Sequence, residues 1–174
     1  MWDPRPALSY LTGPGYGGVQ SRELVANRRS GRRLAGVSAD WNNKVIAEFR
    51  SNEGRVGGPF EGATLLLLHS TGAKSGLERI SPVMAFEFDG RLYIVGSAAG
   101  SDVDPAWLHN LRAHPDAHIE IGTDAYDVAA REVPRAERDA LYPRIVEQAP
   151  GFGGYQSKTD RVIPVVELSR RSSD

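Results

Sequence analysis

The chain has 174 residues, a net charge of −1 and a hydrophobic fraction of 40%, values that are typical of one soluble globular domain. No apolar run approaches the ~20 residues that a membrane-spanning helix needs, which excludes an integral membrane protein. There is no cysteine, which excludes disulfides, cysteine–zinc sites, iron–sulfur clusters and cysteine nucleophiles, and fits a reducing cytoplasm.

Residues 1–39 form a basic segment with few folding signals. They hold six arginines against two acidic residues, and prolines and glycines crowd the stretch from Pro4 to Gly18. We expect a flexible tail, because so few apolar side chains cannot offset the entropy lost on ordering. Contact of this basic arm with anionic lipid or with nucleic acid is the alternative role. The remaining residues are net acidic, which argues against nucleic-acid binding.

The folded domain is expected over residues 40–170 and begins with a helix. Asp40 is typical of a helix N-cap, apolar residues follow it at helical spacing, and Gly54 is a typical helix stop. Residues 52–62 hold four glycines and one proline, which predicts a loop after this helix.

Three strands should follow this loop, over residues 64–69, 78–88 and 91–97. The first is continuously apolar, which predicts a strand buried on both faces. Pro82 lies inside the second strand and requires a free edge or a bulge there. Asp89-Gly90 predicts a tight hairpin turn between the second and third strands.

The second half of the chain alternates helices with strands. Asp104 is predicted to cap a helix that opens at Pro105 and ends near His114. The later elements are a hairpin over residues 117–132, a helix from Pro134, a glycine break over residues 150–154 and a strand over residues 162–168. Because hairpins outnumber crossovers, we predict an α+β protein with a mainly antiparallel sheet or small barrel decorated by helices.

The turn after the first strand has the composition of an anion site. Backbone amides of Gly72, Ala73, Ser75 and Gly76 lie beside two cations, Lys74 and Arg79. Amides in a tight glycine turn together with two cations suit a phosphate or a carboxylate. A solvated hairpin turn is the alternative interpretation.

Two further segments suggest a site for a flat ring. Residues 97–100 are small and allow close approach to the backbone, and Trp107 and Asn110 lie on one helix face. Residues 155–161 are polar, follow a glycine break and suit a lid. The alternatives are an ordinary loop, a core tryptophan and, for Tyr155, a tyrosine packed in the core.

Familiar catalytic templates are absent from the sequence. It contains no nucleophile elbow and no phosphate-binding P-loop. The stretch from Gly13 to Gly18 is glycine-rich but follows no predicted strand, so it does not qualify as a Rossmann glycine fingerprint. His109 and His114 are five residues apart on one helix, a poor spacing for metal ligation, so we expect no metal site. His69 ends a buried strand and is expected to be structural.

Four motifs together resemble the deazaflavin-dependent nitroreductase and quinone reductase family. They are LLLLHSTGAKSGLERISP from Leu65 to Pro82, YIVGSAAG from Tyr93 to Gly100, PAWLHN from Pro105 to Asn110 and YQSKTDRVIP from Tyr155 to Pro164. The resemblance spans about residues 43–168. It implies a split β-barrel that binds the 8-hydroxy-5-deazaflavin coenzyme F-420. It also implies hydride transfer to quinone-like acceptors, with nitroaromatics as adventitious substrates.

The resemblance also implies a role for each matching residue. The phosphate and glutamyl tail would be held by Ala73, Lys74, Ser75 and Arg79. The sugar-alcohol chain and ring would be lined by Ile80, Ser81, Pro82, Val83 and Met84. The ring would be flanked by Val95, Gly96, Ser97 and Ala98 and closed on its opposite side by Ala106, Trp107, Leu108, His109 and Asn110.

The predicted reaction needs a hydrogen-bond donor for the anion that hydride transfer creates. Tyr155, on a hinged lid, or Ser97 would supply it. The family often has two tyrosines near Phe152 and Tyr155, and only Tyr155 matches here, which weakens the expectation of nitro-drug activation. The alternatives are an FMN-binding reductase on the same barrel, a non-catalytic coenzyme carrier and a basic-arm interaction protein.

Overall fold

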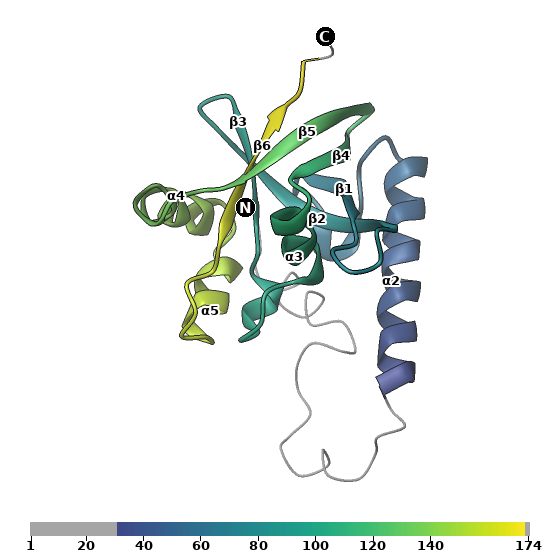
Figure 1. Ribbon diagram of the computed structural model, residues 1–174, viewed down its shortest axis with the longest axis horizontal. Coiled ribbons are helices and arrows are strands. Elements are labelled where there is room, and N and C mark those ends of the chain that lie inside the picture. The colour runs from purple at the N-terminus through teal and green to yellow at the C-terminus, as the bar shows by residue number, and fades with distance from the viewer. Residues whose placement is uncertain (1–30, 173–174) are drawn as a thin grey trace.

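A closed barrel of six antiparallel strands forms the centre of the molecule (Figure 1). The computed structural model describes residues 31–172, with side chains from Ala39 onward. The strands are β1 (Leu65–Thr71), β2 (Glu78–Phe88), β3 (Arg91–Val95), β4 (Asp116–Ile121), β5 (Asp124–Glu132) and β6 (Val165–Arg170). Their order around the barrel is β1-β2-β3-β6-β5-β4, and β4 closes onto β1. The prediction of an antiparallel barrel decorated by helices is confirmed.

The leucine run of β1 explains how the barrel is covered on both sides. Leu65, Leu66, Leu67 and Leu68 are at most 2% exposed. Successive side chains of a strand point to opposite faces. Leu66 and Leu68 accordingly join the barrel core with residues such as Ile94, while Leu65 and Leu67 join a second cluster under the first helix.

That first helix, α2 (Gly31–Ser51), begins earlier than the sequence suggested. Asp40 lies inside the helix and is not its N-cap. The helix extends toward the N-terminus over residues 31–39, which were expected to belong to the tail. The rest of the expected tail, residues 1–30, lies outside the described residues. Val45 and Phe49 pack the helix onto the barrel, and this packing stabilises the helix more than a local cap would.

Four helices and two 3₁₀ turns complete the described structure. Besides α2 they are α3 (Ala106–Ala113), α4 (Arg135–Gln148) and α5 (Gly151–Ser157), with the turns η1 (Gly58–Phe60) and η2 (Ala98–Gly100). Two expectations need correction. The glycine-rich stretch after α4 is itself helical, and α3 is preceded by Pro105 as N-cap without a side-chain cap. No helix of the described part is both long and apolar enough to cross a membrane.

The β2–β3 hairpin behaves as its sequence predicts. Asp89 and Gly90 both have positive φ, 55° and 73°, as the tight turn requires. β2 pairs with β3 only from Ala85 onward, although it pairs with β1 at Pro82. The first half of β2 therefore has a free edge, which is where a proline without an N–H is tolerated.

Candidate active site

Two adjoining hollows lie along this free edge of β2, between it and α3. The inner pocket is a cavity of about 300 Å³, and the outer groove extends from it toward the β1–β2 turn. Both are lined by Asn42, Ser81, Ala106 and Trp107, so they form one continuous depression. The gap exists because β2 pairs with β3 only from Ala85 onward, and no other strand within residues 31–172 pairs with that edge of β2 before Ala85.

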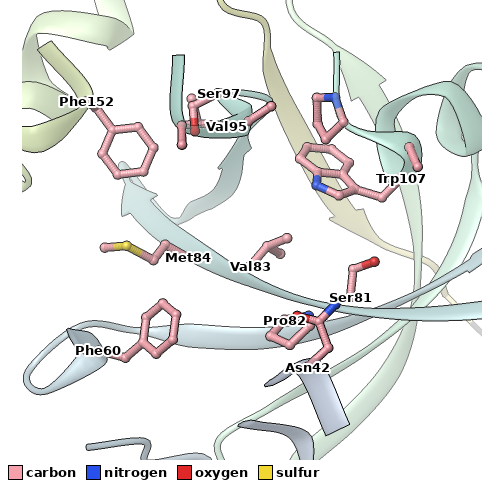
Figure 2. Close-up of a pocket in the computed structure, with 14 residues that line it drawn as sticks. Asn42, Phe60, Ser81, Pro82, Val83, Met84, Val95, Ser97, Trp107 and Phe152 are labelled. Atoms are coloured by element: carbon pink, nitrogen blue, oxygen red, sulfur yellow. The ribbon is translucent and has the colours of Figure 1, made fainter. Parts of the chain in front are cut away.

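The inner pocket is mainly apolar. Phe60, Met84 and Phe152 lie at one end, and Trp107, Ser81 and Asn42 lie at the end that meets the outer groove (Figure 2). Its remaining lining residues are Pro82, Val83, Val95, Ser97, Ala98, Ala99, Pro105 and Ala106. A concave apolar cavity with a few polar groups suits a flat ring.

The wall segment, residues 97–99, has a backbone conformation that is costly for residues with a Cβ. Ala98 and Ala99 have φ values of 44° and 54°. Gly100 follows with φ of 83°, and a Cβ there would lie 2.8 Å from the carbonyl oxygen of Tyr155. Glycine at this position therefore allows η2 to approach α5.

The outer groove contains the two cations that the sequence singled out. Lys74 and Arg79 line it together with Ala73 and Ser75. Both cations are exposed, so they are available to a ligand from solvent. The same groove is bordered on the α3 side by His109 and Asn110.

The backbone amides of this turn contribute less than predicted. Gly72 N donates to the carbonyl of Leu77, and Gly76 N donates to that of Gly72, both at 2.8 Å. Ala73 N donates to Asn110 Oδ1 at 2.9 Å. Three of the four expected amide donors are thus used within the protein. The groups of the turn that remain available to a ligand in the groove are chiefly the side chains of Lys74 and Arg79 and the residue Ser75.

Asn110 connects α3 to the β1–β2 turn. Its side chain is buried; Oδ1 accepts from Ala73 N and Nδ2 donates to Ser70 Oγ at 3.1 Å. A buried amide with both ends satisfied fixes the positions of its partners. Asn110 therefore sets the distance between the turn and the helix that forms the opposite side of the groove.

Most of the predicted site residues come together in this depression. Those that line it are Ala73, Lys74, Ser75, Arg79, Ile80, Ser81, Pro82, Val83, Met84, Val95, Ser97, Ala98, Ala106, Trp107, His109 and Asn110. Gly96 and Leu108 do not line it. Leu108 is in the barrel core, and a Cβ on Gly96 would lie 3.0 Å from Leu108 Cδ2.

The site residues named from the sequence did not include Asn42, Phe60, Ala99 and Pro105, although Ala99 belongs to the small-residue segment 97–100 that was singled out. Asn42 and Phe60 come from α2 and η1, which are brought to β2 only by packing of the helix cluster. An asparagine on a helix and a phenylalanine in a loop carry no local signal for a site. Ala99 and Pro105 directly adjoin residues that were named and could have been included with them.

Tyr155 lies in the core and not on the pocket wall. It is 1% exposed, belongs to α5 and meets the Phe152 ring edge-on at 5.4 Å between centroids. Its hydroxyl has no hydrogen-bond partner among the described residues, and burial raises its pKa to about 12. The expected hinge is helical in this structure, and this conformation does not present the hydroxyl to the pocket.

His69 has the structural environment that was expected of it. Its Nδ1 lies 3.1 Å from Glu78 and its Nε2 lies 2.7 Å from Glu120. Glu120 also accepts from Arg50, and the hydrogen bonds from Arg50 and His69 lower the pKa of Glu120 to about 2. This cluster lies outside both hollows.

The depression has the two properties that a deazaflavin nucleotide-like coenzyme needs. The cations of the outer groove suit an anionic tail, and the apolar inner pocket suits a tricyclic ring. The residues present therefore fit the group that the sequence motifs implied.

Comparison with known proteins agrees with the coenzyme that the motifs and the depression indicate. Residues 41–169 match the family model described as F420H(2)-dependent quinone reductase. The F420H(2)-dependent quinone reductase Rv1261c of Mycobacterium tuberculosis is 39% identical over 130 residues, which are 72% of this chain and 87% of that protein. The solved structure of the F420-H2 dependent reductase FDR-A is similar at a TM-score of 0.55 and 37% identity, over 60% of this chain and 93% of that one.

A more distant likeness concerns the fold alone. HutZ, a heme storage protein from Vibrio cholerae, has a TM-score of 0.50 at 14% identity and covers 76% of this chain and 92% of its own. The family match covers most of the chain, and the sequence motifs and the groove agree with it. The chain belongs to the F420H(2)-dependent quinone reductase family.

Proposed function

We propose that this protein uses the continuous depression to bring reduced coenzyme F-420 and a quinone-like acceptor into contact for hydride transfer. The observation that carries the proposal is one cleft with two cations at its outer end and an apolar pocket at its inner end. Family membership supports an oxidoreductase that takes hydride from reduced F-420 to a quinone.

The outer groove would hold the tail of the coenzyme. Lys74, Arg79 and the Ser75 hydroxyl supply charge-assisted and neutral hydrogen bonds to phosphate and carboxylate oxygens. Asn110 keeps the turn at a fixed distance from α3. These contacts supply affinity and orientation and take no part in the chemical step.

The inner pocket would hold the ring with its reactive face toward the acceptor. When bound, the reduced coenzyme supplies the hydride. Val83, Met84 and Val95 exclude water from the reacting surfaces, and Trp107 closes the side toward the outer groove. No strongly acidic or basic side chain is needed for this step.

Ser97 is the better-placed candidate for the donor to the anionic acceptor oxygen. It lines the inner pocket, whereas the Tyr155 hydroxyl is buried away from it. A hydroxyl on the wall can donate to an oxygen that gains charge during the reaction. Tyr155 would serve only after a movement of α5.

Quinones fit the apolar end formed by Phe60, Met84 and Phe152. Nitroaromatics are a second acceptor class of similar flatness. Phe152 offers them no hydroxyl, so we propose slower reduction of nitroaromatics than of quinones.

The test is a fluorescence titration with F-420 and with FMN, followed by turnover with a soluble quinone and a nitroaromatic. We expect tight F-420 binding, weak FMN binding and quinone reduction. Preference for FMN would support the alternative cofactor. Binding of F-420 without turnover would support a non-catalytic carrier.

We also propose a cytoplasmic location with peripheral membrane contact through the basic N-terminal residues. Arg22, Arg28 and Arg29 lie outside the described residues, and Arg32 and Arg33 lie in the first turn of α2. Clustered arginines are attracted to anionic lipid surfaces. Co-sedimentation of the full chain with anionic but not with neutral vesicles is the expected result.

A further inference from the structure

Arg161 lies just outside the lining of the inner pocket, in the segment between α5 and β6. Its side chain is only 16% exposed and makes four contacts, three hydrogen bonds to backbone carbonyls and one ion pair. Nε donates to the carbonyl of Ser101 at 2.7 Å, and one Nη donates to the carbonyls of Gly96 and Ser97 at 3.0 and 2.8 Å. The other Nη pairs with Asp104 at 2.8 Å.

These contacts surround residues 97–99, whose backbone conformation is energetically unfavourable. Positive φ at Ala98 and Ala99 persists only where neighbouring groups over-determine it. The local hydrogen bonds, from Gly100 N to Ser97 O and from Ser101 N to Ala98 O, belong to a single short turn. Arg161 adds bonds on both sides of that turn.

The same guanidinium also reaches the second wall of the pocket. Asp104 directly precedes Pro105 and Ala106, which line the inner pocket at the start of α3. Its carboxylate does not cap α3 as the sequence suggested, and is shared by Arg161 and Arg112. Arg161 thus joins the wall segment to the start of α3 through one rigid fork.

Arg161 is itself held from α5. Gln156 Nε2 donates to the carbonyl of Arg161 at 2.8 Å, and Gln156 Oε1 accepts from Arg138 of α4. Thr159, which lies in the same segment as Arg161, donates from its Oγ1 to the carboxylate of Asp102 at 2.8 Å, and Asp102 directly follows Ser101. The backbone of Arg161 is therefore held in place, and so are the groups that its guanidinium contacts.

We propose that Arg161 is a positioning residue that keeps residues 97–99 and the start of α3 at the separation a deazaflavin ring requires. The inference rests on the proposed function. Because the outer groove is held separately by Asn110, loss of Arg161 affects how the ring sits and leaves the binding of the tail nearly intact.

Arg161→Lys is the informative variant, because lysine keeps the charge and loses the planar fork that reaches several carbonyls at once. Arg112→Lys is its matched control: Arg112 shares Asp104 and also pairs with Glu132, yet binds none of the wall carbonyls. For each variant the coenzyme dissociation constant, its salt dependence, kcat with a soluble quinone and the thermal midpoint are measured.

For Arg161→Lys we expect kcat to fall at least 10-fold, the dissociation constant to rise less than about 3-fold and its salt dependence to stay unchanged. The absorption band of the bound coenzyme should move toward that of the free coenzyme. Arg112→Lys should keep kcat within 2-fold. Adding Ala99→Gly to Arg161→Lys should recover part of kcat, since glycine adopts positive φ without strain.

An Arg161→Lys protein with wild-type kcat, or with kcat and affinity lost in equal proportion, overturns the inference. If Arg161→Lys does not fold, Asp104→Asn removes the carboxylate charge that Arg161 and Arg112 share, and Arg112→Lys controls for the loss at Arg112. Asp104→Asn should lower kcat at least 3-fold at nearly constant affinity, and an unchanged kcat overturns the inference. A wild-type chain that neither binds F-420 nor reduces quinones overturns the proposed function and the inference together.

Discussion

The outer groove and the inner pocket are parts of one depression, yet different forces build them. The outer groove is formed by an exposed turn whose cations face solvent, and one buried amide, Asn110, fixes its position. The inner pocket is formed by half-buried apolar side chains and by the strained wall segment, residues 97–99, to which Arg161 donates hydrogen bonds from outside the pocket lining. The first should respond to salt and charge, and the second to packing and backbone shape.

In the proposed function, this division assigns coenzyme affinity to the outer groove and the chemical step to the inner pocket. An anionic tail can be gripped by flexible surface cations, because Coulomb attraction tolerates small displacements. Hydride transfer requires two reacting atoms at contact distance, which demands rigid walls. Substitutions should therefore be able to damage the two regions independently.

Tyr155 gives the largest expected effect and tests the packing behind the inner pocket. Tyr155→Ala should destabilise the protein by about 3–5 kcal/mol, because it removes a fully buried aromatic ring that packs against Phe152. Tyr155→Phe should be neutral or stabilising and keep kcat, because the hydroxyl it removes has no partner among the described residues. Urea unfolding and steady-state kinetics check both. A 10-fold loss of kcat in Tyr155→Phe would return the hydroxyl to the mechanism.

The two cations of the outer groove come next. Lys74→Ala should weaken coenzyme binding by about 5- to 100-fold, the range of a lost charge-assisted hydrogen bond, and Arg79→Ala should do the same. Saturating coenzyme should restore a near-normal kcat in each. The affinity of the wild type should also fall with added salt. Lys44→Ala, on the exposed side of α2, is the control; an effect of Lys44→Ala equal to that of Lys74→Ala would contradict a local site.

Asn110→Ala should have an intermediate effect on the outer groove. It leaves Ala73 N–H and Ser70 Oγ without their partner and frees the turn from α3. We expect about a 10-fold loss of coenzyme affinity at nearly constant kcat, corresponding to about 1.4 kcal/mol. Isothermal titration and kinetics measure the two quantities. Asn43→Ala, at an exposed position, should change neither; a fall in kcat larger than the loss of affinity would show that the two regions are not independent.

Glu120 gives the smallest effect and lies apart from both regions. Arg50 and His69 lower its pKa from the ordinary 4.5 to about 2, so the folded state favours the carboxylate. The stabilisation is therefore complete above about pH 4.5 and is lost as the pH falls toward 2. Because Arg50 is half-exposed, we expect only about 1 kcal/mol.

The measurement for Glu120 is urea unfolding of the wild type and Glu120→Gln at several pH values. Their difference in stability should be largest near neutrality and shrink below about pH 4.5. Glu61→Gln, on an exposed loop, should show no such trend. A difference that persists at pH 2 would point to packing and not to charge.

The sequence was most informative where a few neighbouring residues decide the structure. The Asp89-Gly90 turn, the doubly buried leucine strand and the free edge at Pro82 all follow from local rules of backbone and pattern, and all three are found. The two cations of the outer groove were also predicted. Lys74 lies in the β1–β2 turn and Arg79 lies at the start of β2, so they are close in sequence and need no long-range contact to come together.

Local rules failed where a distant partner competes for the same group. The amide of Ala73 was expected to face an anion and is taken by Asn110. Asp104 was expected to cap α3 and pairs instead with Arg112 and Arg161. In each case a residue far along the chain offers a better hydrogen bond than the local alternative.

By itself, the sequence determined the hairpins of the sheet, the two cations at the β1–β2 connection and, through its motifs, the family and its coenzyme. Only the tertiary structure decided where α2 begins, that Tyr155 is buried and that Asn42 and Phe60 reach the inner pocket. It also decided that Arg161 donates hydrogen bonds to the wall segment of that pocket. The physical reason is that turns and strand faces are set by φ, ψ and side-chain alternation within a few residues. Burial and hydrogen-bond partners are set by contacts that exist only once the barrel has closed.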